Sequence, residues 1–397
     1  MRSRIIRLVL VTPDGTVVGC LPPIPVNVPW WQEVESVVRA TREHHGLEVT
    51  ILRLLQVADD QSDQVEVTYL AEIGEPVQAE VWAGKIEPHP LRQSYAQPGG
   101  PTADLAWAAG ILARHGLAPT AKPVQIRTWN LSSVWRIPIG DQSAWLKVVP
   151  SFLGHEPHII TALAGLPVPT LLGYDECGRI LLAEIAGDDM YEATLPQLLS
   201  MVTLLVDIQA MWIGRVEELR AMRMPDWCGP SLISKITDVL QRTNEELSQG
   251  ERASLSRFVS GLADRFSEID ACGLPNTLVH GDCHPGNFRG TEFALTLLDW
   301  GDSGIGHPLL DQPAFLDGIP PEHVKTVKDH WNHQWSARIP GCAPARAADL
   351  LAPVATARRA VIYQHFLDNI EPSEHIYHDG DPVDWLRRTA ALVSKSG

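Results

Sequence analysis

Two stretches of the C-terminal half decide the fold, TLVHGDCHPGNF at residues 277–288 and DWGDSGIGHPLLD at residues 299–311. Their residue types fit phosphoryl transfer from a nucleoside triphosphate to a hydroxyl group. Such a transfer needs a carboxylate that orients the attacking hydroxyl and accepts its proton, and it needs oxygen ligands for Mg²⁺ beside the phosphates. Asp282 suits the first role. Asn287 offers a carbonyl oxygen and Asp299 a carboxylate, which are the hard oxygen ligands that magnesium prefers.

The two stretches contain three patterns in a fixed order. The pattern HGDxHxxN covers residues 280–287, an Asp-Trp pair follows at 299–300, and G-x-P-x-x-D covers residues 306–311. In this combination the sequence resembles the aminoglycoside phosphotransferase and choline kinase superfamily. The resemblance implies an α+β fold, with a two-lobed, protein-kinase-like phosphotransferase domain whose large lobe carries catalysis and acceptor binding.

The resemblance also implies roles for individual side chains. It makes Asp282 the catalytic base and makes Asn287 and Asp299 the ligands of Mg²⁺, with ATP or GTP as the phosphoryl donor. It further makes Lys147 the cation that pairs with the α- and β-phosphates and Glu156 the carboxylate that pairs with this lysine. Because Pro157 follows Glu156, this glutamate is expected either at the N-cap of a helix or inside it.

The nucleotide-binding loop is expected in TWNLSSVWRI at residues 128–137, between two predicted strands. This loop has no glycine, so Ser132 and Ser133 are the small residues that would contact phosphates together with backbone amides, and a simple turn is an equal alternative. Further along, RILLAEIAG resembles the strand and hinge between two lobes. The backbone from Glu184 to Ala186 is therefore expected to bind adenine.

Three domains are expected from composition and periodicity. Residues 1–98 alternate short apolar runs with one helical segment and end in a Pro/Gly-rich stretch, which predicts a small α/β accessory domain. Residues 99–185 begin with a helix at 102–116 and continue with strands at 124–129, 133–139 and 143–149, as expected for the small lobe. Residues 186–397 have helical periodicity at about 193–215, 233–247 and 252–271, as expected for the large lobe.

The first domain weakly resembles a Nudix domain, through a helix at about 30–45 and the stretch REHHGLEV. Its catalytic pattern is broken. When Arg39 is aligned with the arginine of the Nudix box, Ala40 and Trp31 stand where glutamates belong, and only Glu43 of the metal-binding pair is retained. A pyrophosphate-cleaving site needs several carboxylates for its metals, so we expect a non-hydrolytic module.

Composition limits the function further. A formal charge of −16 disfavours nucleic acid as a partner and would suit a cationic acceptor. The six cysteines are scattered and no secretory leader or membrane-length apolar stretch is evident, so a cytoplasmic location and no membrane partner are expected. The oligomeric state cannot be read from the sequence.

The acceptor is open at this point. Aminoglycosides, nucleoside-type antibiotics, amino-sugars, choline-like alcohols and homoserine-like metabolites all carry a suitable hydroxyl. Asp302 and Asp317 are acidic side chains of the large lobe that could attract a cationic acceptor. Two other functions are alternatives, namely a nucleotide-binding pseudokinase and a Nudix-type hydrolase with a passive kinase-like domain.

Overall fold

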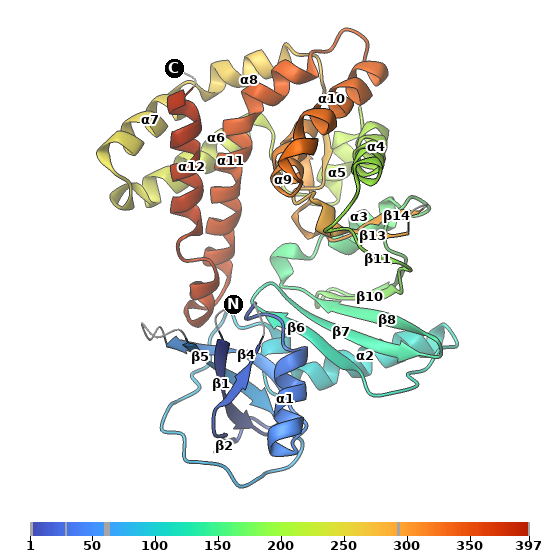
Figure 1. Ribbon diagram of the computed structural model, residues 1–397, viewed down its shortest axis with the longest axis vertical. Coiled ribbons are helices and arrows are strands. Elements are labelled where there is room, and N and C mark those ends of the chain that lie inside the picture. Colours follow the sequence, from blue (N-terminus) through green and yellow to red (C-terminus); the bar gives the residue numbers. More distant parts are fainter. Residues whose placement is uncertain (1–2, 28–29, 59–63, 292–293, 396–397) are drawn as a thin grey trace. The chain divides into compact units, whose positions relative to one another are not determined.

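The computed structural model describes residues 3–27, 30–58, 64–291 and 294–395 (Figure 1). The chain forms two compact units. Unit 1 comprises residues 1–154, 170–184 and 367–377, and unit 2 comprises residues 155–169, 185–366 and 378–397. The three-domain division with a boundary near residue 98 stays a prediction.

The first sheet of unit 1 has the strand order β2-β1-β5-β4, with β3 paired to the free part of β1. Its strands are rich in β-branched and aromatic residues, which pack well on a pleated surface. Strands β1 and β5 are parallel, and β4 is antiparallel to β5. Helix α1 (Glu35–His45) ends at Gly46, whose φ of +66° is readily adopted by glycine. The strands are β1 (Ser3–Val11), β2 (Val17–Cys20), β3 (Ile24–Val26), β4 (Thr50–Ala58) and β5 (Gln64–Glu72).

The second sheet of unit 1 is antiparallel, with the order β6-β7-β8-β10-β9. Helix α2 (Gly100–Arg114) packs against it. This helix begins earlier than expected, because Gly99 with φ +78° is its N-cap and Thr102 already lies in its first turn. The strands are β6 (Val124–Trp129), β7 (Ser132–Ile139), β8 (Gln142–Val148), β9 (Leu171–Tyr174) and β10 (Arg179–Ala183), with short 3₁₀ turns η1 (Ser94–Ala96) and η2 (Ser151–Leu153).

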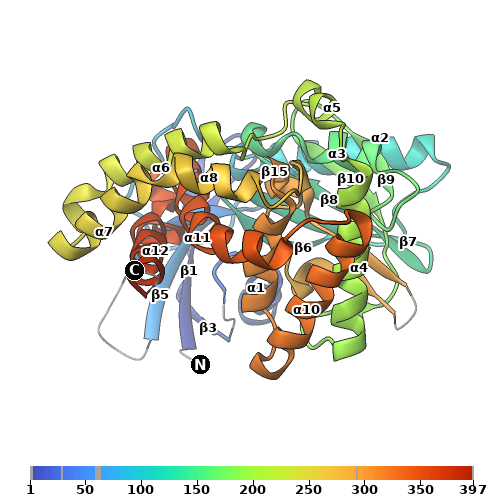
Figure 2. The ribbon, with the colours of Figure 1, turned by 90° about the horizontal axis from the view of Figure 1, so that it is seen from above.

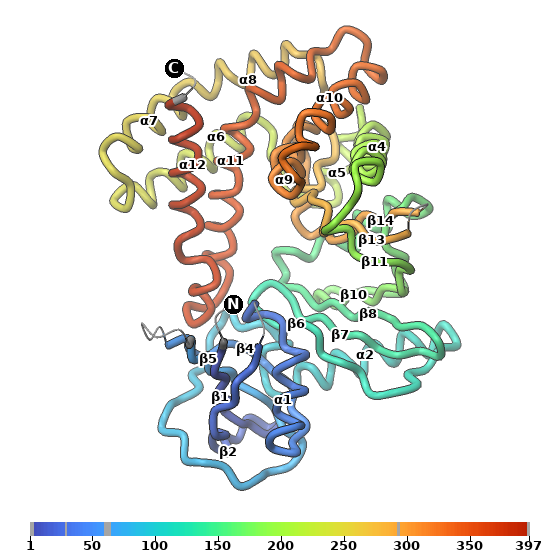
Figure 3. Tube along the Cα trace, in the orientation of Figure 1, coloured from blue at the N-terminus to red at the C-terminus, as the bar shows by residue number. Residues whose placement is uncertain are grey.

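A buried glutamine joins the two sheets of unit 1. The side chain of Gln125 in β6 accepts a hydrogen bond from the Ile51 amide (2.9 Å) and donates one to the Ile51 carbonyl (2.7 Å). A third part of unit 1 comes from far along the chain. This segment, Leu367–Tyr377, includes the 3₁₀ turn η7 (Pro372–Tyr377) and packs beside β4, as the tube in Figure 3 shows. We call it the strap.

Unit 2 is mainly helical, with two small sheets of order β11-β13-β14 and β12-β15. Helices α7 and α12 run side by side, as do α4 and α10 (Figure 2). The helices are α3 (Glu156–Ala162), α4 (Leu195–Met211), α5 (Val216–Ala221), α6 (Gly229–Arg242), α7 (Gln249–Ser260), α8 (Leu262–Asp270), α9 (Gln312–Asp317), α10 (Pro321–Arg338), α11 (Pro344–Asn369) and α12 (Asp381–Lys395). The strands are β11 (Asp188–Asp189), β12 (Thr277–Val279), β13 (Phe288–Gly290), β14 (Leu295–Leu297) and β15 (Gly304–Gly306). The 3₁₀ turns are η3 (Asn244–Glu246), η4 (Pro285–Asn287), η5 (Trp300–Asp302) and η6 (Pro308–Asp311).

The α+β class predicted from the sequence is confirmed. The helical segment expected at about 252–271 consists of two helices, α7 and α8, which meet at Gly261. Large aromatic side chains fill the core of unit 2, where Trp212, Trp300, Trp331 and Trp335 are all fully buried. None of the helices in the described ranges is long and apolar enough to cross a membrane.

Candidate active site

Two small sheets of unit 2 bring the two sequence patterns together. The loop His280–Asn287, which we call the HGD loop, lies between β12 and β13. Asp299 lies just after β14, and β14 is paired with β13. Strand β15, which follows η5, pairs with β12 at the start of the HGD loop. Two short antiparallel strand pairs therefore hold the HGD loop beside Asp299, which follows it by about 12 to 20 positions in the sequence.

A buried carboxylate anchors the start of the HGD loop. The two oxygens of Asp311 accept hydrogen bonds from the backbone amides of His280 (2.9 Å) and Gly281 (2.7 Å). The Gln209 side chain donates a third hydrogen bond to Asp311 (2.8 Å). Burial raises the pKa of the Asp311 carboxyl, although nearby His280 and the two amides act in the opposite direction. The family pattern contains Asp311, but its anchoring role was not predicted.

The backbone at Gly281 needs glycine. Its φ is +94°, and a Cβ atom there would lie 2.0 Å from the carbonyl oxygen of Asp302. The adjacent His280 is fully buried, and its Nε2 lies 2.8 Å from the Leu298 carbonyl oxygen. Because a carbonyl only accepts, this nitrogen carries the proton. Burial lowers the pKa of His280, which favours the neutral ring.

Asp282 and Asn287 contact each other directly. The side-chain amide nitrogen of Asn287 donates to the backbone carbonyl of Asp282 (2.8 Å) and to its carboxylate (3.3 Å). The side-chain oxygen of Asn287 is therefore left for a different partner. His284 Nε2 lies 3.6 Å from the Asp282 carboxylate. Burial opposes ionisation of Asp282, but the interaction with His284 outweighs it, so the pKa of Asp282 lies below its usual value.

Asp299 adopts a backbone conformation that is uncommon for residues other than glycine. Its φ of +56° is left-handed, which costs on the order of 1–3 kcal/mol and often occurs at functional sites. A methyl group at Gly301 would lie 3.6 Å from the Asp299 carboxylate and 3.8 Å from that of Glu156. Glu156 is buried and is the first residue of α3. It therefore lies inside the helix, whose N-cap is His155. The carboxylates of Asp299 and Glu156 face the same glycine. The side-chain oxygens of Asp299 and Asn287 are of the kind that a divalent cation binds.

The other predicted nucleotide-binding residues lie in unit 1, apart from Ala186. Lys147 is the second-to-last residue of β8 and pairs with Val134 of β7 and Ile180 of β10. Glu184 follows β10 and accepts a hydrogen bond from the Trp145 indole (3.2 Å). The chain passes from unit 1 to unit 2 directly after Glu184, which places Ala186 in unit 2.

Ser132 and Ser133 begin strand β7, so the connection to β6 is a tight turn of two residues. Both serines are buried. The Ser132 hydroxyl accepts from the Trp129 indole and the Ser133 hydroxyl from the Trp135 indole, each at 3.1 Å. These hydroxyls therefore shape the turn.

Two residues beside the HGD loop were not predicted from the sequence. Arg358 of α11 is buried, donates to the Gly281 carbonyl (3.2 Å) and lies over the Trp227 ring. Tyr191, whose exposed fraction is 69%, lies against the other end of the loop, with its ring 6.3 Å from that of His284. Both are remote from the motif in sequence, and no local pattern marks them.

Among its described residues, the first sheet and helix α1 bring no Nudix-like set of metal ligands together. Glu43, which aligned with a Nudix metal ligand, is exposed on α1. Across the described ranges, no cluster of three or more histidine, cysteine, aspartate or glutamate side chains could hold a metal ion. The Nudix resemblance of this domain stays a prediction.

Comparisons with known proteins address the family and the fold of this chain. The model of the phosphotransferase enzyme family matches residues 10–347. A type I macrolide 2'-phosphotransferase resembles 74% of this chain over 97% of its own length, with 16% identity and a TM-score of 0.51. Choline kinase LicA from Streptococcus pneumoniae resembles 74% of this chain over 99% of its own length, with 12% identity and a TM-score of 0.52. At these identities the likeness concerns the fold. No curated protein matches the chain in sequence.

Proposed function

Since the chain belongs to the phosphotransferase enzyme family, we propose that it transfers the γ-phosphoryl group of ATP or GTP to a hydroxyl group of a small molecule. The contact between Asp282 and Asn287, close to the left-handed Asp299, is the observation that supports this function. These are the residue types that orient a hydroxyl and hold magnesium in kinases. The anchor of Asp311 on the loop backbone fixes their positions.

Asp282 is the proposed catalytic base. Because its pKa lies below the usual value, the carboxyl is ionised at neutral pH and accepts a hydrogen bond from the acceptor hydroxyl. A carboxylate of low pKa is a weak base. In a loose transition state the proton leaves late, so its main contribution is to align the hydroxyl oxygen with the γ-phosphorus.

Asn287 and Asp299 are the proposed ligands of Mg²⁺. When bound, the ion would neutralise charge on the phosphates. The hydrogen bond from the Asn287 side-chain nitrogen to Asp282 fixes the orientation of the amide. Its side-chain oxygen is then the atom that would bind the ion. The left-handed backbone of Asp299 sets the direction of its carboxylate.

The remaining predicted residues serve the nucleotide in this proposal. Lys147 pairs with the α- and β-phosphates, and Glu156 is its carboxylate partner. The β6–β7 turn, together with Ser132 and Ser133 at the start of β7, presents backbone amides to the phosphates. The backbone from Glu184 to Ala186 binds the base, and this position coincides with the passage of the chain between the two units.

The acceptor is proposed as a hydroxyl-bearing small molecule, such as an aminoglycoside, a nucleoside-type antibiotic or an amino-sugar. The two acids considered for a cationic acceptor both have arginine neighbours. Asp317 lies 3.8 Å from Arg359, and Asp302 interacts electrostatically with Arg358. These contacts reduce the attraction that the acids would exert on a cation. The exposed ring of Tyr191 beside the HGD loop is therefore the better candidate for an acceptor contact.

Consumption of ATP and of GTP in the presence of Mg²⁺, measured across a panel of these hydroxyl acceptors, tests the proposal. Turnover should depend on the acceptor and should fall by roughly 10²–10⁴-fold in Asp282→Ala, with nucleotide affinity unchanged. Asp264→Asn, an exposed acid of α8, is the matched control and should retain full turnover. Unchanged turnover in Asp282→Ala would refute the assigned base, and nucleotide binding without transfer to any acceptor would favour a pseudokinase.

A further inference from the structure

Unit 1 contains a cavity of about 560 Å³ beneath one face of its first sheet. Side chains of β1, β4 and β5, the segment around residues 82–92 and the strap line it. We call it the arginine cavity, after Arg53 and Arg92 in its wall. Its volume lies in the range of small-molecule sites, which is about 300–1,000 Å³. None of the predicted active-site residues lines it.

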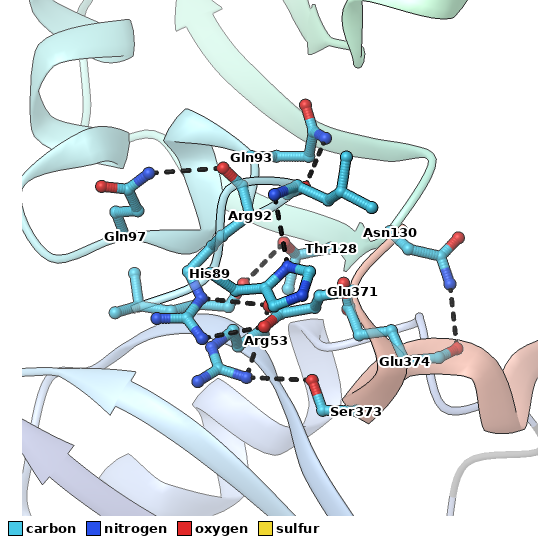
Figure 4. Close-up of polar contacts among 12 residues, drawn as sticks. Arg53, His89, Arg92, Gln93, Gln97, Thr128, Asn130, Glu371, Ser373 and Glu374 are labelled. Atoms are coloured by element: carbon cyan, nitrogen blue, oxygen red, sulfur yellow. Dashed lines mark hydrogen bonds and ion pairs between the residues drawn. The ribbon is translucent and has the colours of Figure 1, made fainter. Parts of the chain in front are cut away.

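In a cluster of charged groups in the wall of this cavity, arginines outnumber the carboxylates that pair with them (Figure 4). The carboxylate of Glu371 binds Arg92 through two hydrogen bonds of 3.1 and 2.8 Å and lies 3.4 Å from Arg53. The side chains of Arg53 and Glu371 are each 4% exposed, and that of Arg92 is 11% exposed. Two guanidinium groups therefore share one carboxylate, which leaves one positive charge in excess.

Neighbouring groups do not cancel this excess. Burial, followed by the nearby charge of Glu371, raises the pKa of Glu374 to about 8, so this carboxyl is protonated at neutral pH. Arg7 and Glu66, on the sheet side, already form a pair with each other at 2.8 Å. At the exposed edge, Lys85 and Glu87 are opposite in sign and balance each other.

The centre of the cluster also has unused hydrogen-bonding capacity. Arg53 donates only a 3.3 Å hydrogen bond to the Ser373 hydroxyl besides its contact with Glu371, and its buried Nε has no hydrogen-bond partner among the described residues. A buried charge without a full set of partners is costly, and a bound counter-ion relieves that cost. In a chain of net charge −16, a buried cationic excess beside a cavity is unexpected unless an anion binds there.

We propose that the arginine cavity binds a small molecule through a compact oxyanion, a phosphate or a carboxylate, which pairs with the guanidinium groups of Arg53 and Arg92. Arginine suits such groups because its planar guanidinium presents several donors to the oxygens. Gln56 and Ser373 provide further polar contacts in the wall, and Trp82 provides an apolar surface for the rest of the molecule. This site is separate from the proposed active site, and either could exist without the other.

Titration calorimetry with inorganic pyrophosphate and with malonate, both in EDTA to remove divalent cations, tests the proposal and distinguishes phosphate from carboxylate. The excess charge predicts opposite effects for two variants. Arg92→Gln leaves one guanidinium for one carboxylate and should weaken binding at least about tenfold. Glu371→Gln removes the competing carboxylate and should strengthen binding several-fold. Arg39→Gln, an exposed arginine of α1 in the same unit, is the matched control and should bind like the wild type.

A purely structural cluster would give a different result. In that case both variants lower the midpoint of thermal unfolding and neither probe binds, or the probes bind all variants equally, and the proposal is wrong. Under the proposal, pyrophosphate or malonate should raise the unfolding midpoint of Glu371→Gln more than that of the wild type. If Arg92→Gln does not fold, Lys85→Ser at the exposed edge replaces it and should weaken binding about threefold.

Discussion

The HGD loop of unit 2 and the β6–β7 turn of unit 1 are both assigned to the reaction, but they are held in different ways. Asp311, which anchors the HGD loop, lies 30 residues from Gly281. Asn130 of the turn donates instead to the backbone carbonyl of Glu374 in the strap, 244 residues away. The first loop is therefore a local structure that a motif specifies. The second depends on a remote segment returning to unit 1.

The largest effect is expected in the HGD loop, at Gly281. Gly281→Ala would force a side chain into a positive-φ backbone and against the Asp302 carbonyl, so it should cost at least about 3 kcal/mol and abolish turnover. Gly250→Ala, near the start of α7, is the matched control. Its φ is not positive and its methyl group would meet no atom within 4 Å. Urea unfolding and acceptor-dependent turnover measure both effects, and equal losses in the two variants would contradict a backbone requirement at Gly281.

A somewhat smaller effect is expected from Asp311→Asn. The amide keeps one acceptor but turns its NH₂ group towards one of the two loop amides, so an N–H loses its partner in a buried site. We expect a loss of about 2–3 kcal/mol in unfolding free energy and a fall in kcat larger than any rise in the KM for nucleotide. Asp264→Asn on the surface of α8 should change neither quantity. Full kcat in Asp311→Asn would show that the HGD loop holds its shape without this anchor.

Local patterns explain how much could be predicted from the sequence. The strand 124–129 and the class of the fold were predicted correctly, because alternation and helical periodicity are properties of neighbouring residues. The HGD loop was also recognised, since its chemistry lies within about 32 residues. The helical periodicity at about 252–271 continues across Gly261, so the sequence did not show that α7 ends and α8 begins there.

The strap could not be predicted for a physical reason. The partners of Glu371 and Glu374 are Arg53, Arg92 and Asn130, which are between 244 and about 318 positions away. Charged residues read as solvated surface unless their partners are known. The burial of Arg358 beside Gly281 was missed for the same reason.

In the strap, which holds the β6–β7 turn, Glu374→Gln should stabilise the protein at alkaline pH. The folded chain raises the pKa of Glu374 from 4.5 to about 8, so unfolding releases a proton between these values. The contribution of the neutral Glu374 carboxyl to the unfolding free energy is fully present below about pH 4.5. It is lost as the pH rises through about 8. Glutamine stays neutral, which alone would raise the unfolding free energy at about pH 8 by roughly 4 kcal/mol. Burying the additional N–H donors of its amide offsets part of this gain, so we expect a net rise of roughly 1–2 kcal/mol.

Thermal unfolding of wild type and Glu374→Gln at about pH 5 and about pH 8 measures this difference. The wild type should lose more of its midpoint temperature between the two conditions than the variant does. Glu75→Gln, an exposed glutamate of the same unit, is the control and should follow the wild type. Parallel pH profiles for wild type and Glu374→Gln would mean that the carboxyl is solvated and that the strap is not buried at this point.

The smallest expected effect is also the most direct test of whether the strap serves the reaction. Asn130→Ala removes the 3.4 Å hydrogen bond to the Glu374 carbonyl, which is long and should contribute about 1 kcal/mol or less. If the strap holds the β6–β7 turn in its nucleotide-binding shape, this loss should raise the KM for ATP up to about fivefold and leave kcat nearly unchanged. Gln97→Ala removes a similar amide-to-carbonyl hydrogen bond, to Arg92, at the surface of the same unit. A KM that rises only in Asn130→Ala supports a remote anchor for this turn, whereas equal KM values in both variants would mean that β6 and β7 shape the turn alone, as a local structure like the HGD loop.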